Sequence, residues 1–159
     1  LALVLVVAFA VRRRSALSLR LVPWRLALLV VGLFLVVAAA HAHGLDEALQ
    51  RITGTGESVG SLLQLGGAAT VGANVVNNLP AYAALEPTAD GGLRTMALLV
   101  GVNCGPLILL WGSLATLLWR ERCRARGLEI SWRSFAGVGL VGVPMVVVAA
   151  IGALALAAA

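Results

Sequence analysis

The stretch "GANVVNNLPAYAALEP", residues 72–87, places three asparagines and a proline in a run that carries no charge before Glu86. The segments on both sides are strongly apolar, as in a protein that faces lipid. An unpaired polar group costs several kcal/mol in such surroundings, so the three carboxamides need partners or a function. They belong to Asn74, Asn77 and Asn78.

Composition defines the class of the protein. Of its 159 residues, 60% are hydrophobic and 12% are charged, whereas a soluble domain has about 25% charged residues. The apolar runs are long and continuous, which predicts an all-α integral membrane protein instead of a barrel of short alternating strands. The excess of arginine lies in two short loops between apolar runs, as the positive-inside rule requires, so no nucleic-acid partner is expected.

Charged residues divide the chain into four uncharged windows of 20 to 28 residues, and a membrane-crossing helix needs about 20. The windows are 26–45, 58–85, 95–119 and 134–159. We expect ordinary transmembrane helices at 26–43 and 134–157. The apolar residues 1–11 are too few to cross alone, so we expect them to end a truncated transmembrane helix and the chain to be the C-terminal part of a longer protein.

The charges also predict which loops are cytoplasmic. Each of the segments 12–25 and 120–133 has five arginines, and together they have only two acids. The segments 46–57 and 86–94 hold two arginines and five of the seven acids. The first pair is therefore expected to be cytoplasmic, with 120–133 along the membrane interface, and the second pair external.

The window 58–85 then begins and ends outside, which a single crossing cannot do, and two crossings need about 40 residues. We therefore predict an external region, 44–92, that contains a re-entrant hairpin reaching about mid-membrane, with its tip at 74–80. Asn77 or Asn78 would cap the returning helix, and Pro80 suits its first turn.

The next window predicts a second interruption. In "GVNCGPLILLWGSLATLLW", residues 101–119, Pro106 removes a helical hydrogen bond and lies beside Gly105. We expect a transmembrane helix at 93–119 that is broken between 103 and 113. Two interrupted elements close in sequence are typical of the binding site of a secondary transporter, because half-helix N-termini offer free N–H groups.

These two stretches, with the basic "RERCRARGLEISWRSF" that follows, resemble the C-terminal repeat of the ion transporter superfamily, and within it the arsenical pump membrane proteins. The resemblance covers about 44–159 and, more loosely, 24–42. It implies two inverted repeats around a midplane site, each with a re-entrant hairpin and a broken helix, in a bacterial inner membrane. It also implies efflux of arsenite or antimonite by a permease or antiporter, and no enzymatic reaction or catalytic residue.

The resemblance further implies which residues bind substrate. Three lie at the hairpin tip and four at the broken helix: Asn74, Asn77, Asn78, Asn103, Gly105, Ser113 and Thr116. The sequence departs from the family pattern at Leu109 and Leu110, where arsenical pumps usually carry Thr-Pro. Two other functions stay open: a sodium- or proton-coupled dicarboxylate or citrate permease of the same superfamily, and a non-transporting membrane subunit.

Amides and hydroxyls match the chemistry of arsenite, which near neutral pH is an uncharged trihydroxide. No cofactor is expected, and coupling to H⁺ or Na⁺ is open because the uncharged windows hold no acid or lysine. The expected partners are membrane lipid, an N-terminal repeat of the same protein and a small oxyacid or anion; a homodimer and a separate ATPase subunit are open.

Simpler roles also fit some of these residues. The asparagines could serve only to cap helices. Cys104 is more typical of a small apolar filler than of a ligand. No metal site is expected at His41 and His43, because their alternate spacing does not put both rings on one helix face.

Overall fold

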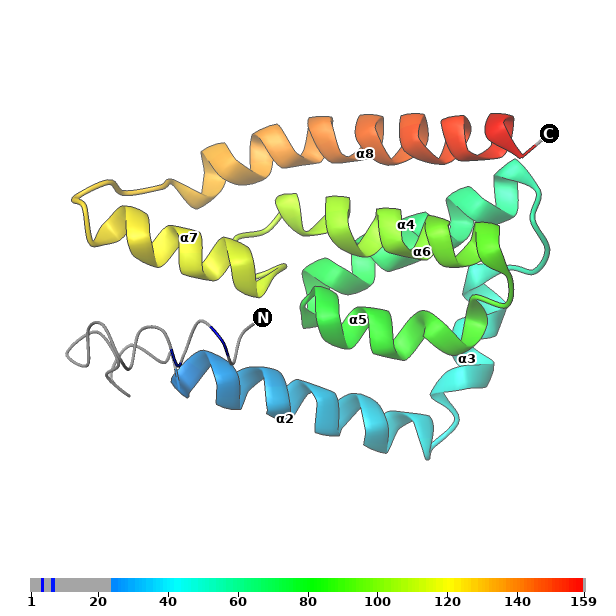
Figure 1. Ribbon diagram of the computed structural model, residues 1–159, viewed down its shortest axis with the longest axis horizontal. Helices are drawn as coiled ribbons and strands as arrows, with labels where there is room; N and C mark the ends of the chain where they lie inside the picture. Colours follow the sequence, from blue (N-terminus) through cyan, green and yellow to red (C-terminus); the bar gives the residue numbers. More distant parts are fainter. Residues whose placement is uncertain (1–3, 5–6, 8–23, 159) are drawn as a thin grey trace. The chain divides into compact units, whose positions relative to one another are not determined.

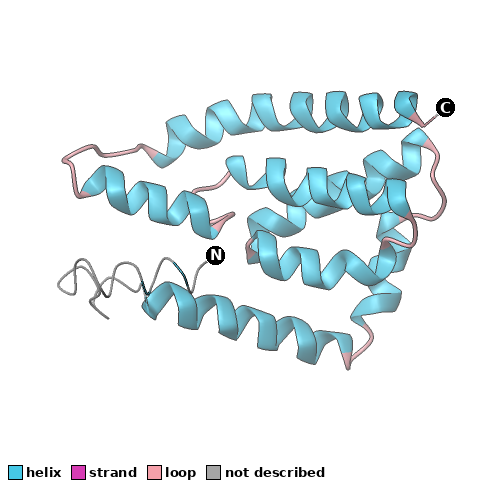
Figure 2. Cartoon of the chain, in the orientation of Figure 1, coloured by secondary structure: helices cyan, strands magenta, loops and turns pink. Residues whose placement is uncertain are grey.

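The computed structural model describes residues 4, 7 and 24–158, and this part of the chain contains helices and loops but no strand (Figures 1 and 2). The predicted all-α class is therefore confirmed. The chain divides into two units, Leu1–Val31 and Gly32–Ala159. The predicted truncated helix at 1–11 and the basic loop at 12–25 lie almost wholly outside the described residues.

Among the residues that the structure describes, three helices are long and apolar enough to cross a membrane. They are α2 (Trp24–His41), α4 (Val59–Val76) and α8 (Trp132–Ala157). The 18 residues of α2 or α4 rise about 27 Å, close to the ~30 Å of a bilayer core. The sequence predicts helices at 26–43 and 134–157, where α2 and α8 lie. The window 58–85, which contains α4, is long enough for one crossing, but the sequence assigns it to a re-entrant hairpin because both of its ends are expected to be external.

A short helix, α3 (Leu45–Thr53), follows α2 and was not predicted. It begins after Gly44, whose φ of 87° favours glycine, and it has acidic residues in its first turn, where they complement the helix dipole. One of them, Asp46, lies with its Oδ1 2.6 Å from Nδ1 of His41 and so joins the end of α2 to the start of α3.

Helices α4 and α5 (Asn78–Leu85) form a hairpin that reverses at Asn77. This turn is shorter than the predicted tip at 74–80, because α4 stays helical through Val76 and α5 begins one residue after Asn77. The arms are unequal: α5 has only eight residues, or about 12 Å, and continues as a 3₁₀ turn at Glu86–Thr88.

Helix α6 (Gly92–Cys104) packs against α4 so closely that glycines are required. A Cβ on Gly101 would collide with the carbonyl oxygen of Gly66 and lie 2.6 Å from Cβ of Ala69. Fully buried side chains fill the rest of this contact, among them Leu65, Leu98 and, from α8, Ile151. In Figure 1, α6 runs beside α5, and α8 lies along the other side of α6.

The chain leaves the helical path after α6. A 3₁₀ turn at Gly105–Leu107 is followed by irregular backbone up to Ser113, and α7 begins at Leu114 and ends at Arg124. The predicted interfacial segment, 120–133, is therefore partly helical: its first residues form the end of α7, and 125–131 link α7 to α8.

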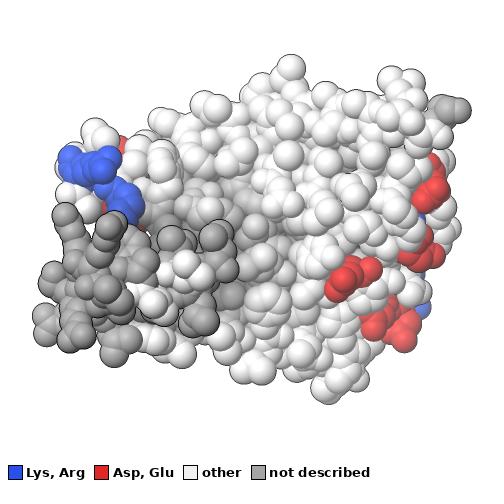
Figure 3. Space-filling view, viewed as in Figure 1, with Lys and Arg blue, Asp and Glu red and all other residues white. Residues whose placement is uncertain are grey.

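Acidic and basic residues gather at opposite ends of the helices of the second unit (Figure 3). The acidic end holds the α3–α4 and α5–α6 connections, which lie together: Oε1 of Glu57 is 2.9 Å from the position that a Cβ on Gly91 would take. The segment that enters the hairpin and the segment that leaves it therefore lie at the same end of the helices.

Arg94 joins these two connections. Its side chain is only 1% exposed, and its guanidinium donates to the carbonyl oxygens of Thr88, Gly54 and Gly56 at 2.9–3.2 Å. A longer contact, 3.4 Å, reaches Thr53, and Asp90 lies 3.3 Å from Nε. A buried charge with this many acceptors fixes the base of the hairpin. From the sequence, Arg94 is expected only to be one of the charges of an external loop.

We expect Arg94→Met to lower the free energy of unfolding by about 3 kcal/mol or more, because a hydrogen bond to a charged group contributes about 1.5–3 kcal/mol and several are lost. Arg94→Lys should be nearly as destabilising as Arg94→Met, since an ammonium lacks the planar fork of donors. Denaturant unfolding in detergent micelles measures both changes.

The matched control is Arg51→Met. Arg51 is exposed in the last turn of α3 and has no ion pair within the described part of the chain. Equal stability losses at the two positions would contradict the role assigned to Arg94.

Candidate binding site

The side chain of Asn74 connects the end of α4 to the interruption between α6 and α7. Its Nδ2 donates to the carbonyl oxygens of Thr70 and Gly105, both at 2.8 Å, and its Oδ1 accepts from the backbone N–H of Leu109 at 2.9 Å. Both donors and the acceptor of this buried carboxamide are therefore used. Asn74 supplies partners to backbone groups that the interrupted helix leaves without their usual ones.

Further bonds join the hairpin reversal to the same irregular segment. Trp111 donates its indole N–H to the carbonyl oxygen of Asn74 at 2.7 Å, and its own carbonyl accepts from Nδ2 of Asn77 at 3.0 Å. The backbone N–H of Asn78 donates to the carbonyl of Gly112 at 2.9 Å. The hairpin reversal at Asn77 and the irregular segment 105–113 therefore form one connected junction, although they are about 30 residues apart in sequence.

Asn77 is unusual in two respects. Its φ of 81° makes it the one non-glycine residue with positive φ among those described. With ψ of 152°, its backbone lies outside the left-handed helical region and in a region adopted almost only by glycine, so it is strained. Its side chain is 4% exposed, yet Oδ1 has no hydrogen-bond partner. A buried acceptor without a donor is costly, so Oδ1 of Asn77 is a polar group at this reversal that still lacks a partner.

Two helices begin beside Asn77. Helix α5 starts directly after Asn77, and α7 starts after Ser113, whose Oγ accepts from the N–H of Thr116 at 3.0 Å and lies 2.8 Å from its Oγ1. In Figure 1 the beginning of α7 faces the beginning of α5. Each N-terminus carries a partial positive charge and N–H groups outside the helical ladder, so the junction favours a ligand rich in oxygen.

The structure confirms Asn77 at the N-cap position of α5, but it shows no capping bond from an asparagine side chain. The amide of Asn77 bonds to Trp111 instead. Asn78, which is half-buried, has no side-chain hydrogen bond to the described residues. Capping by a side chain is seen instead at Ser58, Ser113 and Ser131.

The structure brings six of the seven predicted residues to this junction and leaves one apart. Gly105 belongs to it through its carbonyl, and a Cβ there would lie 2.7 Å from Cα of Thr70. Asn103 is exposed on α6 and donates to the carbonyl of Leu99 in its own helix at 2.8 Å. It lies instead in a groove between α6 and α8.

Sequence reasoning missed Trp111 and the backbone N–H of Leu109. No local signal indicates that an indole will reach a carbonyl 37 residues earlier in the chain. The Gly112-Ser113 pair is the local sequence signal that indicates a turn of the backbone before α7. The contact made by Leu109 uses its backbone and not its side chain, so it does not require the threonine usual at this position.

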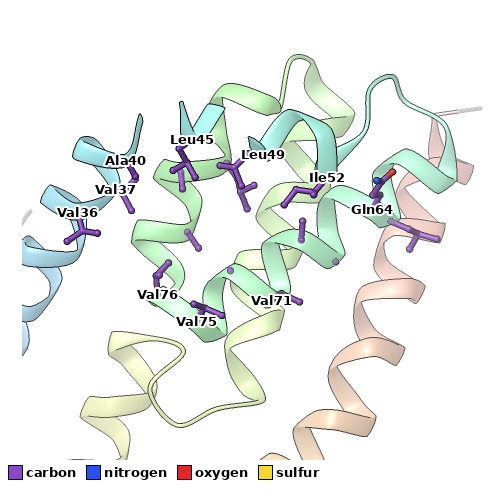
Figure 4. Close-up of a pocket in the computed structure, with 17 residues that line it drawn as sticks. Val36, Val37, Ala40, Leu45, Leu49, Ile52, Gln64, Val71, Val75 and Val76 are labelled. Atoms are coloured by element: carbon purple, nitrogen blue, oxygen red, sulfur yellow. The ribbon is translucent and has the colours of Figure 1, made fainter. Parts of the chain in front are cut away.

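Other features are less suited to bind a polar ligand. An apolar groove of about 680 Å³ lies among α2, α3, α4 and α5, with Gln64 as its one polar labelled side chain (Figure 4). Such a surface fits lipid or another helix better than an oxyacid. Among the described residues, no three His, Cys, Asp or Glu side chains are placed to hold a metal ion.

Comparison with known proteins identifies the family. The family model for the arsenical pump membrane protein matches residues 2–156. The chain is 29% identical over 167 aligned residues to arsenical pump membrane proteins of Yersinia enterocolitica and of Escherichia coli, a match that covers 95% of this chain. An arsenical pump membrane protein of Escherichia coli strain K12 is 28% identical over 87% of the chain.

The chain spans 39% of the length of the first two relatives. No solved structure matches it. The resemblance drawn from the two interrupted stretches is confirmed by a family match over nearly all of the sequence. The chain is a membrane protein, and it belongs to the arsenical pump membrane protein family.

Proposed function

We propose that this chain forms part of a secondary carrier that exports arsenite or antimonite across the bacterial inner membrane. The observation that carries the proposal is the junction of the two helix interruptions, where a buried, unpartnered Oδ1 of Asn77 lies beside the N-termini of α5 and α7. Membership of the arsenical pump membrane protein family supports the substrate class.

The junction offers what a small polyhydroxy acid requires. A neutral trihydroxide of arsenic carries hydroxyl groups that donate and accept, and it has no charge to be desolvated. Oδ1 of Asn77 can accept from one hydroxyl, while the N-termini of α5 and α7 offer donors to another. Asn78, Ser113 and Thr116 add polar groups next to these, whereas Asn74 and Gly105 hold the junction together.

The same geometry supports a membrane topology. In this proposal α4 and α5 form a re-entrant hairpin, and α6 and α7 are the two halves of one broken transmembrane helix. Arg94 holds both ends of the hairpin together, and the acidic end lies opposite the basic one. With 120–133 cytoplasmic, the base of the hairpin is external and its reversal lies inside the membrane.

A second, inverted repeat would supply the other half of the site. The curated relatives are more than twice as long as the aligned chain, which leaves room for such a repeat in the same polypeptide. A proton carrier beside the hairpin reversal would come from that repeat, because α4, α5 and α6 contain no acid, lysine or histidine. A homodimer and an ATPase subunit remain compatible with this arrangement.

Asn77→Gly should abolish most arsenite transport while leaving the fold intact. Glycine accepts a φ of 81°, so the reversal survives, but the carboxamide is gone. The variant leaves a buried substrate hydroxyl without its acceptor, at a cost of about 1–3 kcal/mol, which predicts about a 5- to 150-fold loss of transport efficiency. Radiolabelled arsenite uptake into everted vesicles measures it, and thermal unfolding in detergent checks the fold.

Gln64→Ala is the matched control, because Gln64 is an amide on α4, the helix that ends just before Asn77, and its side chain lines the apolar groove instead. It should transport as the wild type does. Wild-type transport by a folded Asn77→Gly protein would exclude Oδ1 as a substrate ligand.

Single cysteines at Glu57 and Glu86 test the topology. In an otherwise cysteine-free protein, a membrane-impermeant maleimide applied to intact spheroplasts should label both positions. A cysteine at Arg122 should be labelled only in everted vesicles. Labelling of Glu57 and Glu86 from opposite sides would show that α4 and α5 together cross the membrane and would refute the re-entrant hairpin.

A further inference from the structure

The basic end of the molecule contains an excess of arginines without carboxylate partners. Between Arg120 and Arg133 there are five arginines and two glutamates, a net charge of +3. The ion pairs within the described residues are His41–Asp46 and Arg94–Asp90, so none involves this segment. In addition, Nε of Arg120 is buried without a hydrogen-bond partner. The arginines of this segment therefore have no anionic partner among the described residues.

An apolar groove begins at the same segment. It has a volume of about 550 Å³ and lies between α8 and the start of the irregular segment after α6. Ile130 and Ser134, at the end of the basic segment, are part of its lining, and from there it follows α8 past Val138 and Gly142 to Val146. Val138 is 75% exposed and Val146 52% exposed, so the groove is open to its surroundings.

A second hollow, of about 350 Å³, adjoins the first and shares Leu107 and Phe135 with it. It extends under Trp119, whose ring centroid is 6.2 Å from that of Phe135. Trp119 directly precedes Arg120 and so links the hollow to the basic end. The aromatic pair lies between the charged residues of this segment and the apolar length of α8, an arrangement typical of aromatic residues at a membrane interface.

This combination matches one kind of ligand. A cluster of cations at one end and an open apolar groove at the other are complementary to an anionic amphiphile. Arginine binds phosphate oxygens well because its planar guanidinium offers paired donors. Basic sites between helices on the cytoplasmic side are also where anionic lipid headgroups bind.

We propose that this groove binds an anionic phospholipid, with its phosphate at the arginines around Arg120 and an acyl chain along α8 toward Val146. The proposal does not depend on the transport function. The groove itself lies outside the junction at Asn77, although the adjoining hollow is lined in part by Thr116. The groove does contact the irregular segment: Leu107 lines the groove two residues after Gly105, which Asn74 holds. An ordered lipid there would support the outer side of that segment.

Native mass spectrometry of the purified protein in detergent tests the proposal. Phosphatidylglycerol and phosphatidylcholine with the same acyl chains are added at equal concentration. We expect at least fivefold more bound phosphatidylglycerol, falling as ionic strength rises because phosphate contacts are screened. Equal retention of the two lipids would overturn the proposal.

Paired variants locate the site. Gly142→Leu fills the groove, because nothing lies within 4 Å of the Cβ it would carry, and Gly152→Leu is its control on the same helix, with equal space but outside the groove. The double variant Arg120→Gln/Arg124→Gln removes cations, and Arg51→Gln removes one at the acidic end. We expect Gly142→Leu and the double variant each to reduce phosphatidylglycerol binding at least threefold, and the controls to leave it unchanged.

Other results would assign the groove differently. If water-soluble glycerophosphoglycerol competes as strongly as the lipid, the arginines bind a free phosphate ester and the groove has no part. If Gly142→Leu binds phosphatidylglycerol normally, another occupant such as a further helix covers the groove. Either result refutes the lipid site.

Discussion

The carboxamide of Asn74 is the contact on which the arrangement of the two helix interruptions depends. Between Gly105 and Ser113 the backbone leaves the helical path, and in lipid each unpaired backbone group costs several kcal/mol. Asn74 supplies a donor to Gly105 and an acceptor to Leu109. A carboxamide carries two N–H donors and a separate acceptor oxygen, so one side chain can hold Thr70, Gly105 and Leu109 at once. An ionised aspartate there could not donate to Gly105.

Small residues bring the backbones close enough for this contact. Gly101 lies against Gly66, and Gly105 against Thr70, so α4 and the end of α6 approach along a line that leads directly to Asn74. Gly139 plays the same part on α8, where a Cβ would collide with the carbonyl of Leu107. The hairpin is thus held at its reversal by amides and at its base by Arg94. Between these points lies a cluster of buried apolar residues.

Much of this arrangement could be predicted, because the strongest signals are local. Runs of apolar residues indicated the long helices, Pro106 with its neighbouring glycines indicated the break after α6, and Asn77 with Pro80 indicated the reversal. The family followed from the same two stretches. These features depend on chain length, proline geometry and charge, all of which can be read from adjacent residues.

What sequence reasoning missed depends on distant contacts. The indole of Trp111 and the guanidinium of Arg94 bind backbone carbonyls, and a carbonyl has no residue type to mark it. The position of Asn103 depends on which way α6 faces after it packs on α4. Helix α3 is short and amphipathic, and its residues are assigned from the sequence to a charged external segment. The length of α4 was underestimated because the reversal takes a single residue.

Hydrogen exchange at the irregular segment tests the central claim most directly. The account predicts that Asn74→Leu speeds exchange of peptides covering 105–113 at least tenfold and leaves peptides within α8 unchanged, because the Leu109 N–H loses its acceptor and the segment loosens. Unchanged protection at 105–113, or an equal loss of protection throughout the helices, would contradict it, since neither result assigns Asn74 the specific task of holding the two interruptions together.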